Sequence, residues 1–276
     1  MKIVVLGSTG MLGYTVGKYF TNKYGERNVY LSKRRKEVTY SNNTFYFDVL
    51  NSLNLLVTNQ FKFPECDYII NCIGLIKQHE KWNTHDALVL NSLFPLELSR
   101  YYKNSDTKII HITTDCVFSG KDGKYIEESL HDALDEYGKT KSLGESCRNG
   151  AMLLRTSIIG EELYNNISLI EWVKSQRNGK IKGYTNHLWN GVTSLQYAKI
   201  CEKIINENLY YKGLYHVFSN IVNKYDLVSM INNYFKLNIE IEPFETEISC
   251  DRSLSTIKDL NNKLDIPSIK HQIEEI

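Results

Sequence analysis

The sequence has few of the features that mark several classes of protein. Only 4 of its 276 residues are proline, so there is no Pro-rich linker, and no apolar run is long enough to span a bilayer. The six cysteines show no C-x-x-C spacing, which argues against a zinc site and against a disulfide framework. We therefore predict no metal site and interpret the cysteines as reduced, mostly structural thiols.

An excess of charge is also missing. The 33 Lys and Arg residues are matched by 32 Asp and Glu residues, so no overall field draws the chain toward nucleic acid or a membrane surface. The chain opens on Met1-Lys-Ile-Val-Val-Leu6 and then turns to glycine, which is too short a run for a signal peptide. We expect a cytoplasmic protein, and its 42% of hydrophobic residues suffice for one large or two modest domains.

Short apolar runs alternate with helix-length segments in the first half of the chain. This order predicts an α/β fold, a Rossmann-type doubly wound parallel sheet. Strands are expected at 2–6, 28–31, 68–72, 108–113 and 151–155, and helices at 10–23, 87–102 and 137–147.

The alternation loosens after about residue 155. A helical stretch at 161–179, a loop at 182–192, helices at 194–206 and 225–235 and a strand at 214–218 are expected there. We predict a dinucleotide-binding domain at 1–157 and a smaller, partly interleaved substrate lobe at 158–276, with the segment around 193–208 packing back on the first domain.

A glycine loop, Gly7-Ser-Thr-Gly10-Met-Leu-Gly13, follows the first expected strand and opens the first expected helix. Glycines let the backbone approach a pyrophosphate, which then sits over the positive end of the helix. The spacing alone is a weak signal, and an ordinary turn is the alternative. The order of strand, loop and helix favours cofactor contacts from Gly7, Thr9, Gly10, Met11, Leu12 and Gly13.

A basic turn, Ser32-Lys-Arg-Arg35, ends the second expected strand, where sites that prefer NAD usually place an acid. A guanidinium pairs in two-pronged fashion with a 2′-phosphate, so Ser32, Lys33 and Arg34 favour NADPH, with NADH as the alternative. A solvated basic turn would have the same sequence. Further on, Asp48, with Val49 beside it, is expected to accept from the adenine amino group unless it is a plain surface acid.

Tyr137-Gly-Lys-Thr-Lys141 carries the chemistry. If the tyrosine and the lysine share a helix, their spacing of four residues places both on one face. A phenol titrates near pH ~10, and a neighbouring ammonium is expected to lower its pKa. The pair predicts proton-transfer machinery beside the dinucleotide site.

The chain resembles the extended short-chain dehydrogenase/reductases, and within them the dTDP-4-dehydrorhamnose reductase family of sugar-nucleotide 4-keto reductases. The resemblance covers nearly the whole chain, and the order and spacing of its motifs are specific. It rests on the glycine loop, Asn71-Cys-Ile-Gly74, Asn91 with Pro95 and Leu96, His111-Ile-Thr-Thr-Asp-Cys-Val-Phe-Ser-Gly120, Tyr137-Gly-Lys-Thr-Lys-Ser-Leu-Gly-Glu145, Leu154-Arg-Thr-Ser157 and Gly213-Leu-Tyr-His216.

The resemblance implies that Thr114, Tyr137 and Lys141 form the catalytic group. It also implies cofactor contacts from Tyr137 and Lys141 and from four residues of the matching motifs: Cys72, Ile73, Gly74 and Asn91. Thr113 is adjacent to Thr114, and strand alternation points only one of them into a site. We choose Thr114 on the family's pattern.

The departures from the family concern the sugar. Cys116 replaces a usual tyrosine, Ser119 stands where an aspartate is common, and the second acid that dehydratases carry is missing. Asp115 is expected either to bind a sugar hydroxyl or to cap local backbone. Trp189, and Lys77 with its neighbour Gln78, are expected either to contact the substrate or to have a purely structural role. The expected substrate contacts are Lys77, Asp115, Cys116, Val117, Phe118 and Trp189.

These residues imply NADPH-dependent reduction of a nucleotide-linked 4-keto-6-deoxyhexose. The substrate resembles dTDP-4-dehydrorhamnose or is a UDP-2-acetamido-2,6-dideoxy-4-hexulose, and a homodimer is one expected assembly. Two alternatives stay open. One is a nucleotide-sugar epimerase with tightly bound NAD. The other is a non-catalytic protein resembling the regulatory subunit of methionine adenosyltransferase, which intact Thr114, Tyr137 and Lys141 disfavour.

Overall fold

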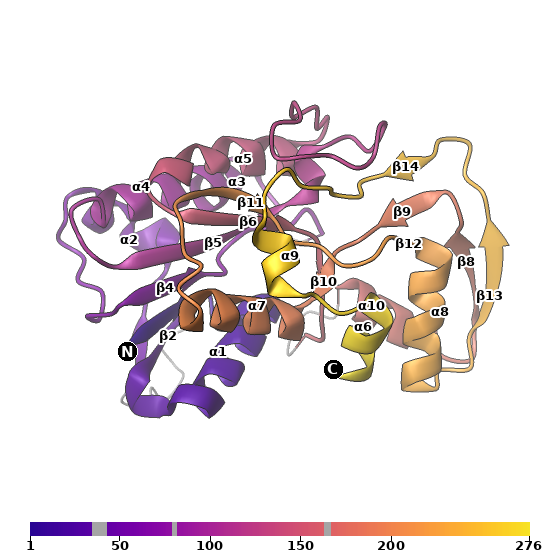
Figure 1. Ribbon diagram of the computed structural model, residues 1–276, viewed down its shortest axis with the longest axis horizontal. Coiled ribbons are helices and arrows are strands. Elements are labelled where there is room, and N and C mark those ends of the chain that lie inside the picture. Colours follow the sequence, from indigo (N-terminus) through magenta and orange to yellow (C-terminus); the bar gives the residue numbers. More distant parts are fainter. Residues whose placement is uncertain (35–42, 79–81, 163–166) are drawn as a thin grey trace.

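A parallel sheet of seven strands forms the centre of the molecule in the computed structural model, which describes residues 1–34, 43–78, 82–162 and 167–276 (Figure 1). The strand order is β11-β6-β5-β4-β1-β2-β3, and every neighbouring pair is parallel. The predicted Rossmann-type α/β fold is confirmed. The strands are β1 (Ile3–Leu6), β2 (Val29–Lys33), β3 (Thr44–Tyr46), β4 (Tyr68–Asn71), β5 (Lys108–Thr114), β6 (Met152–Thr156) and β11 (Gly213–His216).

The central strands are apolar on both faces because helices cover both sides of the sheet. Every residue of β1, β4 and β6 is buried. On one side lie α1 (Met11–Tyr24) and α7 (Ser194–Asn206), and on the other lie α2 (Val49–Val57), α4 (Phe94–Tyr101) and α5 (Glu136–Gly144) (Figure 1). Strand β3 and helix α2 were not predicted.

The helix predicted at 87–102 is in fact three pieces. Helix α3 (Thr84–Leu88) leads into one wide π turn, η2 (Val89–Leu93), which leads into α4. The carbonyl of Asn91 in this turn lies so close to α5 that a Cβ on Gly144 would be 2.0 Å from its oxygen. The turn therefore sits at a close helix contact, a feature that a helical repeat in the sequence does not reveal.

The helix predicted at 137–147 is likewise shorter. Helix α5 ends at Gly144, and a 3₁₀ turn, η4 (Glu145–Asn149), continues the chain. Two further 3₁₀ turns are η1 (Glu26–Asn28) before β2 and η3 (Asp115–Val117) directly after β5. Turn η3 follows the end of β5, so it lies at the edge of the sheet where ligands bind in this class of fold.

A second group of small elements has its own apolar core, formed by residues such as Ile170, Trp189, Leu227 and Ile231. Its helices are α6 (Leu169–Ser175), α8 (Lys224–Phe235) and α10 (Ile269–Glu274), and α9 (Leu260–Leu264) packs on the main core instead. Its strands are β8 (Lys180–Tyr184) with β13 (Glu240–Phe244), β7 (Ile158–Ile159) with β10 (Val192–Thr193), and β9 (His187–Trp189) between β12 (Val222–Asn223) and β14 (Cys250–Asp251).

Two predictions for this region were wrong. The segment 182–192 is not a loop, because β9, β10 and the end of β8 lie in it. Their partners are mostly far away in sequence, as when Cys250 pairs with His187, so local patterns do not reveal them. The predicted helix at 161–179 shrinks to α6 among the described residues, and positions 163–166 lie outside them.

The second half of the chain also contributes to the first core. Strand β11 forms the edge of the main sheet beside β6, and Tyr197 of α7 packs in the same core as Val16 of α1. Tyr24 donates to Asn206 at 2.9 Å across the two helices. A division at residue 157 stays a proposal. None of the helices in the described ranges has the length and apolar character needed to cross a membrane.

Candidate active site

The glycine loop forms a tight turn that leads into α1. Gly7 has a φ of +81°, a left-handed conformation that favours glycine, and its carbonyl accepts from Gly10 N at 3.0 Å. A Cβ on Gly13 would be 2.1 Å from Gly7 O. No side chain caps the start of α1, so the N–H groups of its first turn, from Met11 to Gly13, remain for a ligand. This cradle fits the pyrophosphate of a dinucleotide.

The basic turn lies at the end of β2, beside the glycine loop. Ser32 is buried and holds that loop, because its Oγ accepts from Gly7 N at 2.8 Å and its carbonyl accepts from Ser8 Oγ at 2.7 Å. Lys33 is half-buried and Arg34 is exposed, and the remaining cation of the predicted turn, Arg35, lies outside the described residues.

Asp48 stands at the N-terminus of α2. Its carboxylate accepts from Leu50 N at 3.2 Å and from Asn51 Nδ2 at 2.9 Å, so it caps the helix, while Val49 is buried. An adenine contact from Asp48 stays a prediction.

The loop after β4 is fixed by two buried asparagines. Asn71 Oδ1 accepts from Ile73 N at 3.1 Å. Asn91 Oδ1 accepts from Leu75 N at 2.8 Å, and its Nδ2 donates to Leu75 O at 3.0 Å and to Thr140 Oγ1 at 3.1 Å. Asn91 therefore links this loop to α5, and a cofactor contact from its side chain stays a prediction.

Lys141 reaches the same loop from α5. A Cβ on Gly74 would be 2.8 Å from Lys141 Nζ and 3.3 Å from Asn91 Oδ1, so glycine makes room for the ammonium. Cys72 lies nearby, since its charge is among those that act on Lys141. The structure thus brings together the predicted residues Cys72, Gly74, Asn91 and Lys141.

Thr114 and Tyr137 meet where β5 ends and α5 begins. Thr114 Oγ1 donates to Asp115 Oδ1 at 3.2 Å and accepts from Cys116 N at 3.1 Å. Thr113, its neighbour, instead donates to Glu145 at 2.7 Å. The approach of α5 requires Gly138, where a Cβ would be 2.3 Å from Cys116 O.

The pKa of Tyr137 is raised, which corrects the direction that we expected from Lys141. Burial of the phenol is the largest cause, Cys116 and Asp115 act in the same sense, and a hydrogen bond with Thr114 acts against them. Desolvation outweighs the favourable contacts, so Tyr137 is protonated at neutral pH. The ring of Trp82 lies edge-on to Tyr137, with 6.5 Å between the centroids.

Burial lowers the pKa of Lys141 to about 8, and the carboxylate of Glu145 is the largest influence in the opposite direction. Glu145 follows Lys141 by four residues, so it lies one turn further along the same side of the chain. The charge of Lys141 therefore depends on an acid that lies outside the predicted catalytic group.

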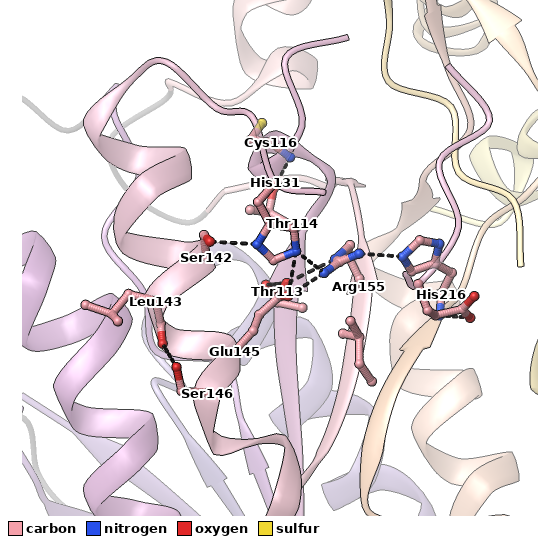
Figure 2. Close-up of polar contacts among 12 residues, drawn as sticks. Thr113, Thr114, Cys116, His131, Ser142, Leu143, Glu145, Ser146, Arg155 and His216 are labelled. Carbon is pink, nitrogen blue, oxygen red and sulfur yellow. Dashed lines mark hydrogen bonds and ion pairs between the residues drawn. The ribbon is translucent and has the colours of Figure 1, made fainter. Parts of the chain in front are cut away.

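Glu145 belongs to a buried charged network around Arg155, shown in Figure 2. Arg155 is 0% exposed, and its guanidinium binds both carboxylate oxygens of Glu145, with Nε to Oε1 at 3.0 Å. Its Nη1 lies 2.8 Å from His216 Nε2 and its Nη2 lies 2.7 Å from His131 Nε2. The guanidinium also covers the ring of Phe118 at 4.8 Å from the centroid.

The network fixes the tautomer of both histidines. Arginine has only donors, so the Nε2 atoms of His131 and His216 must accept and both imidazoles are neutral. Their Nδ1–H groups then donate, to Ser142 Oγ at 2.6 Å and to Ser255 O at 2.6 Å respectively. In agreement, burial lowers the pKa of His131 and lowers that of His216 to about 4.

The predicted substrate residues divide into two groups. Val117 and Phe118 are completely buried, and Phe118 stacks on Tyr125, so their side chains pack the core rather than face a substrate as we expected. Lys77 is exposed and lies 3.4 Å from Asp135. Trp189 is 3% exposed and belongs to the core of the second group of elements.

Asp115 and Cys116 remain beside the catalytic pair. Asp115 is 4% exposed and burial raises its pKa, while burial raises the pKa of the Cys116 thiol to about 12. Such a thiol is not an activated nucleophile. Ser119 is explained locally, because its backbone N donates to Asp132 Oδ1 at 2.7 Å and an aspartate at 119 would repel that acid.

The sequence contained a signal for the network that we did not use. Arg155 and His216 interrupt otherwise apolar strands, and both stand in motifs quoted above, as does Glu145. A charge inside a buried strand must be paired, but only the fold shows that its partners come from β11, η4 and the loop before α5.

Comparison with known proteins finds one family model that matches most of the chain and curated relatives with two different names. The family model described as RmlD substrate binding domain matches residues 1–256. Methionine adenosyltransferase 2 subunit beta of Xenopus tropicalis is 25% identical over 258 residues, which cover 86% of this chain and 72% of that protein. The dTDP-4-dehydrorhamnose reductase of Aggregatibacter actinomycetemcomitans is 26% identical over 227 residues, which cover 78% and 72%.

Among solved structures, dTDP-4-dehydrorhamnose reductase from Bacillus anthracis in complex with NADP has a TM-score of 0.75 at 21% identity, covering 99% of this chain and 97% of that one. MoeE5 in complex with UDP-glucuronic acid and NAD has a TM-score of 0.73 at 17% identity, covering 99% and 96%. At these identities the two structures bear on the fold alone, and they agree with the parallel sheet described above.

Proposed function

The chain belongs to the RmlD substrate binding domain family of extended short-chain dehydrogenase/reductases, as its motifs predict, and from this premise we propose that it reduces the 4-keto group of a nucleotide-linked 4-keto-6-deoxyhexose with NADPH. One arrangement carries the proposal: the half-buried Tyr137 lies beside Thr114, and Lys141 lies on the same helix. The proposal includes a nucleotide-sugar substrate, a cytoplasmic location and a homodimer.

The residues of the chain supply the proton in this reaction. Reduction of a ketone builds negative charge on its oxygen, which a nearby proton donor stabilises. Tyr137 is protonated at neutral pH because burial raises its pKa, so its phenol donates a proton to that oxygen. The Thr114 hydroxyl donates to Asp115 Oδ1 in this structure and would turn to donate to the same ketone oxygen. Lys141, as an ammonium, stabilises the phenolate that remains. A bound nicotinamide cofactor would supply the hydride.

The site fits such a cofactor. The turn from Gly7 to Gly13 offers backbone N–H groups to a pyrophosphate, and Lys33 and Arg34 at the end of β2 offer cations to a 2′-phosphate. Lys141, beside Gly74, would hold the nicotinamide ribose. The relatives solved with NADP and with NAD support a nicotinamide cofactor, with NADH as the alternative.

The choice of NADPH is tested by removing the cations. The double variant Lys33→Ala, Arg34→Ala should lower the ratio of kcat/KM for NADPH over NADH by about tenfold or more, since hydrogen bonds to charged groups contribute roughly 1.5–3 kcal/mol. An unchanged ratio would show that these residues do not read the phosphate.

The choice of sugar is a further part of the proposal. The contact with Asp132 accounts for the serine at position 119. Among the departures from the family pattern, Cys116 therefore bears most directly on the substrate. A thiol at this position leaves more room than a tyrosine, which supports a bulkier sugar such as a UDP-2-acetamido-2,6-dideoxy-4-hexulose. The dTDP-linked ketosugar is the other member of the proposal.

A panel assay tests the reductase. Purified protein is mixed with NADPH and with dTDP- and UDP-linked 4-keto-6-deoxy sugars, and loss of nicotinamide absorbance is followed. Turnover of at least one member is expected. Binding of NADPH without turnover of any member would favour the second candidate, a regulatory subunit, which the similarity to methionine adenosyltransferase 2 subunit beta supports.

A further inference from the structure

A small sheet carries two cations, Lys224 and Arg252, and places the first of them over an aromatic ring. Strand β9 ends in Trp189 and lies between β12 and β14, with Val222 opposite Trp189 and Asp251 opposite Leu188. Lys224 follows β12 directly and Arg252 follows β14 directly. The Lys224 ammonium lies 5.0 Å from the centroid of a Trp189 ring, a cation–π contact that holds it in place.

This sheet packs against the segment that follows the catalytic strand. Arg252 Nε donates to Phe118 O at 3.0 Å, and Asp251 N donates to Gly120 O at 2.7 Å. The contact is close enough that a Cβ on Gly120 would be 2.6 Å from Cys250 Sγ. The sheet and η3, which begins one residue after Thr114, are thus held in a fixed relation.

Lys224 is half-buried, so its cation keeps part of its contact with water. Among the residues that the structure describes, its ammonium makes no hydrogen bond and no ion pair, and Trp189 supplies only a ring face. The carboxylate of Asp115 is the charge that acts on it most strongly in its favour. Asp115 is itself buried, and Thr114 Oγ1 donates to its Oδ1 at 3.2 Å.

Lys224 and Asp115 influence each other's pKa but form no ion pair in the described part of the chain. Lys224 and Arg252 both act on Asp115, yet none of the ion pairs among the described residues joins Asp115 to either cation. Charges withdrawn from water are costly unless they are paired or hydrogen-bonded. A group placed between Lys224 and Asp115 must accept from the ammonium, which has donors only, and donate to the carboxylate, which has acceptors only.

We propose that Lys224 is a specificity-determining residue that holds a substituent of the sugar ring next to the reacting ketone, with Asp115 as the partner for the donor of that substituent. A hydroxyl or an acylamino group offers both a donor and an acceptor, whereas a hydrogen atom or a methyl group offers neither. The assignment rests on the proposed function, because Asp115 directly follows Thr114 and so places the substituent beside the reacting carbon.

The test measures binding rather than turnover. The full chain, saturated with NADP⁺, is titrated calorimetrically with UDP, UDP-glucose and UDP-N-acetylglucosamine, and with dTDP and dTDP-glucose. Lys224→Met keeps an apolar stem over Trp189 but removes the charge. It should weaken at least one nucleotide sugar by about tenfold or more, the loss of one charged hydrogen bond, and leave the sugar-free UDP and dTDP within about twofold. The sugar that loses most identifies the substituent.

Lys182→Met is the matched control. Lys182 is an exposed lysine of the same part of the molecule, and its ammonium lies 3.9 Å from the ring centroid of Phe244. Lys182 makes the same kind of cation–π contact as Lys224, but it lies away from the proposed catalytic residues. The Lys182→Met variant should therefore bind every ligand as the unmodified protein does. Lys224→Arg keeps the charge and should retain part of the affinity, which separates loss of the contact from misfolding.

Several outcomes would overturn the assignment. One is sugar affinity in Lys224→Met within twofold of the unmodified protein. Another is an equal loss for UDP or dTDP alone, which would assign Lys224 to the diphosphate. Failure of the unmodified protein to bind any nucleotide sugar would overturn the assignment and the proposed function together. Sugar binding that depends on Lys224 without turnover in the NADPH assay would sustain the assignment and overturn the reductase.

Discussion

Lys141 shows how single residues set the chemistry of this site. Burial lowers the pKa of its ammonium to about 8, and Glu145 opposes that effect more than any other group. Gly74 leaves the room that the ammonium occupies. A residue outside the predicted catalytic group therefore decides whether the lysine is charged at neutral pH. Glu145 is a positioning residue, since it acts through Lys141 and Arg155.

Replacement of Glu145 by Gln should shift the pH dependence of the reaction. Without the carboxylate the pKa of Lys141 falls further below its ordinary value, so the ammonium is lost at lower pH. The alkaline limb of kcat/KM should move toward acid by roughly one pH unit or more. The measurement is kcat/KM from pH 6 to 10, a range that extends about two units on either side of the Lys141 pKa of about 8.

A second variant guards against simple loss of folding. Removing one partner of a buried ion pair lowers the free energy of unfolding by about 3–5 kcal/mol. Glu145→Gln leaves the buried charge of Arg155 without its carboxylate, so it also lowers stability. Glu145→Asp keeps the charge and should restore the alkaline limb, and Glu240→Gln, which breaks an exposed pair with Lys180, should not move it. An unshifted limb in folded Glu145→Gln would refute the role given to Glu145.

Among the elements, α5 carries most of the site and depends on two glycines for its position. Gly144 packs on the wide turn η2, and Gly138 packs on the Cys116 carbonyl that follows β5. The contact at Gly138 brings Tyr137 beside Thr114, because Tyr137 is the preceding residue on the helix. The distance between Tyr137 and the end of β5 is thus set by the absence of a side chain at Gly138.

Gly138→Ala should separate these two elements. A Cβ at this position would lie 2.3 Å from Cys116 O and 2.5 Å from Ala133 Cβ, both close to backbone, so the helix has to shift. We expect kcat to fall by about 100-fold, the effect of a displacement of about 1 Å. Lys139→Ala, at the next and exposed position of α5, should leave kcat nearly unchanged. Equal kcat values in the two variants would contradict this account.

Sequence patterns predicted the elements whose signals are local. The apolar runs at β1, β4, β5 and β6 and the glycine loop sufficed for the Rossmann-type sheet, and the predicted helix at 194–206 matches α7 to the residue. The spacing of Tyr137 and Lys141 predicted one helix, and both lie on α5.

Elements fixed by distant contacts were missed. The strands β9, β12 and β14 have two or three residues each, and the pairings that create them join residues up to 63 positions apart, as between His187 and Cys250. For the same reason the partners of Arg155 and the contact of Lys224 with Trp189 could not be predicted. The burial that raises the pKa of Tyr137 is likewise a property of the folded chain.

Across the whole molecule, the Arg155 network connects the main sheet to the last part of the chain. His216 of β11 binds Arg155 of β6 and Ser255 O, and its backbone N donates to Glu127 at 3.1 Å. Glu127 also accepts from Thr256 at 2.6 Å. The segment that follows Arg252 is therefore held to the sheet through neutral imidazole and buried charge, and the integrity of the fold is coupled to pH.

Stability should fall in mild acid because His216 must stay neutral in the folded state. Burial lowers its pKa from 6.5 to about 4, so the unfolded chain takes up a proton as the pH falls below about 6.5 while the folded protein does not. This contribution is complete above pH 6.5 and is lost between about 6.5 and 4. The slope for one histidine is up to about 1.4 kcal/mol per pH unit in the free energy of unfolding.

Urea unfolding between pH 7.5 and 4.5 measures this slope, a range of roughly three units that spans the ordinary titration of histidine. His216→Gln removes the titrating group and should make the fall shallower, whereas replacement of the exposed His271 by Gln should leave it unchanged. Equal slopes for the His216→Gln variant and the unmodified protein would show that the network does not link folding to protonation.

The central claim is that Tyr137 is the proton donor of a ketone reductase, and Tyr137→Phe tests it most directly. With NADPH and the ketosugar found in the panel, the phenylalanine variant should lose turnover by a factor of about 100 to 10,000, the range for general acid catalysis, while its Kd for NADPH stays within about twofold. The exposed Tyr184→Phe should be as active as the unmodified protein. Full turnover by Tyr137→Phe would contradict the account.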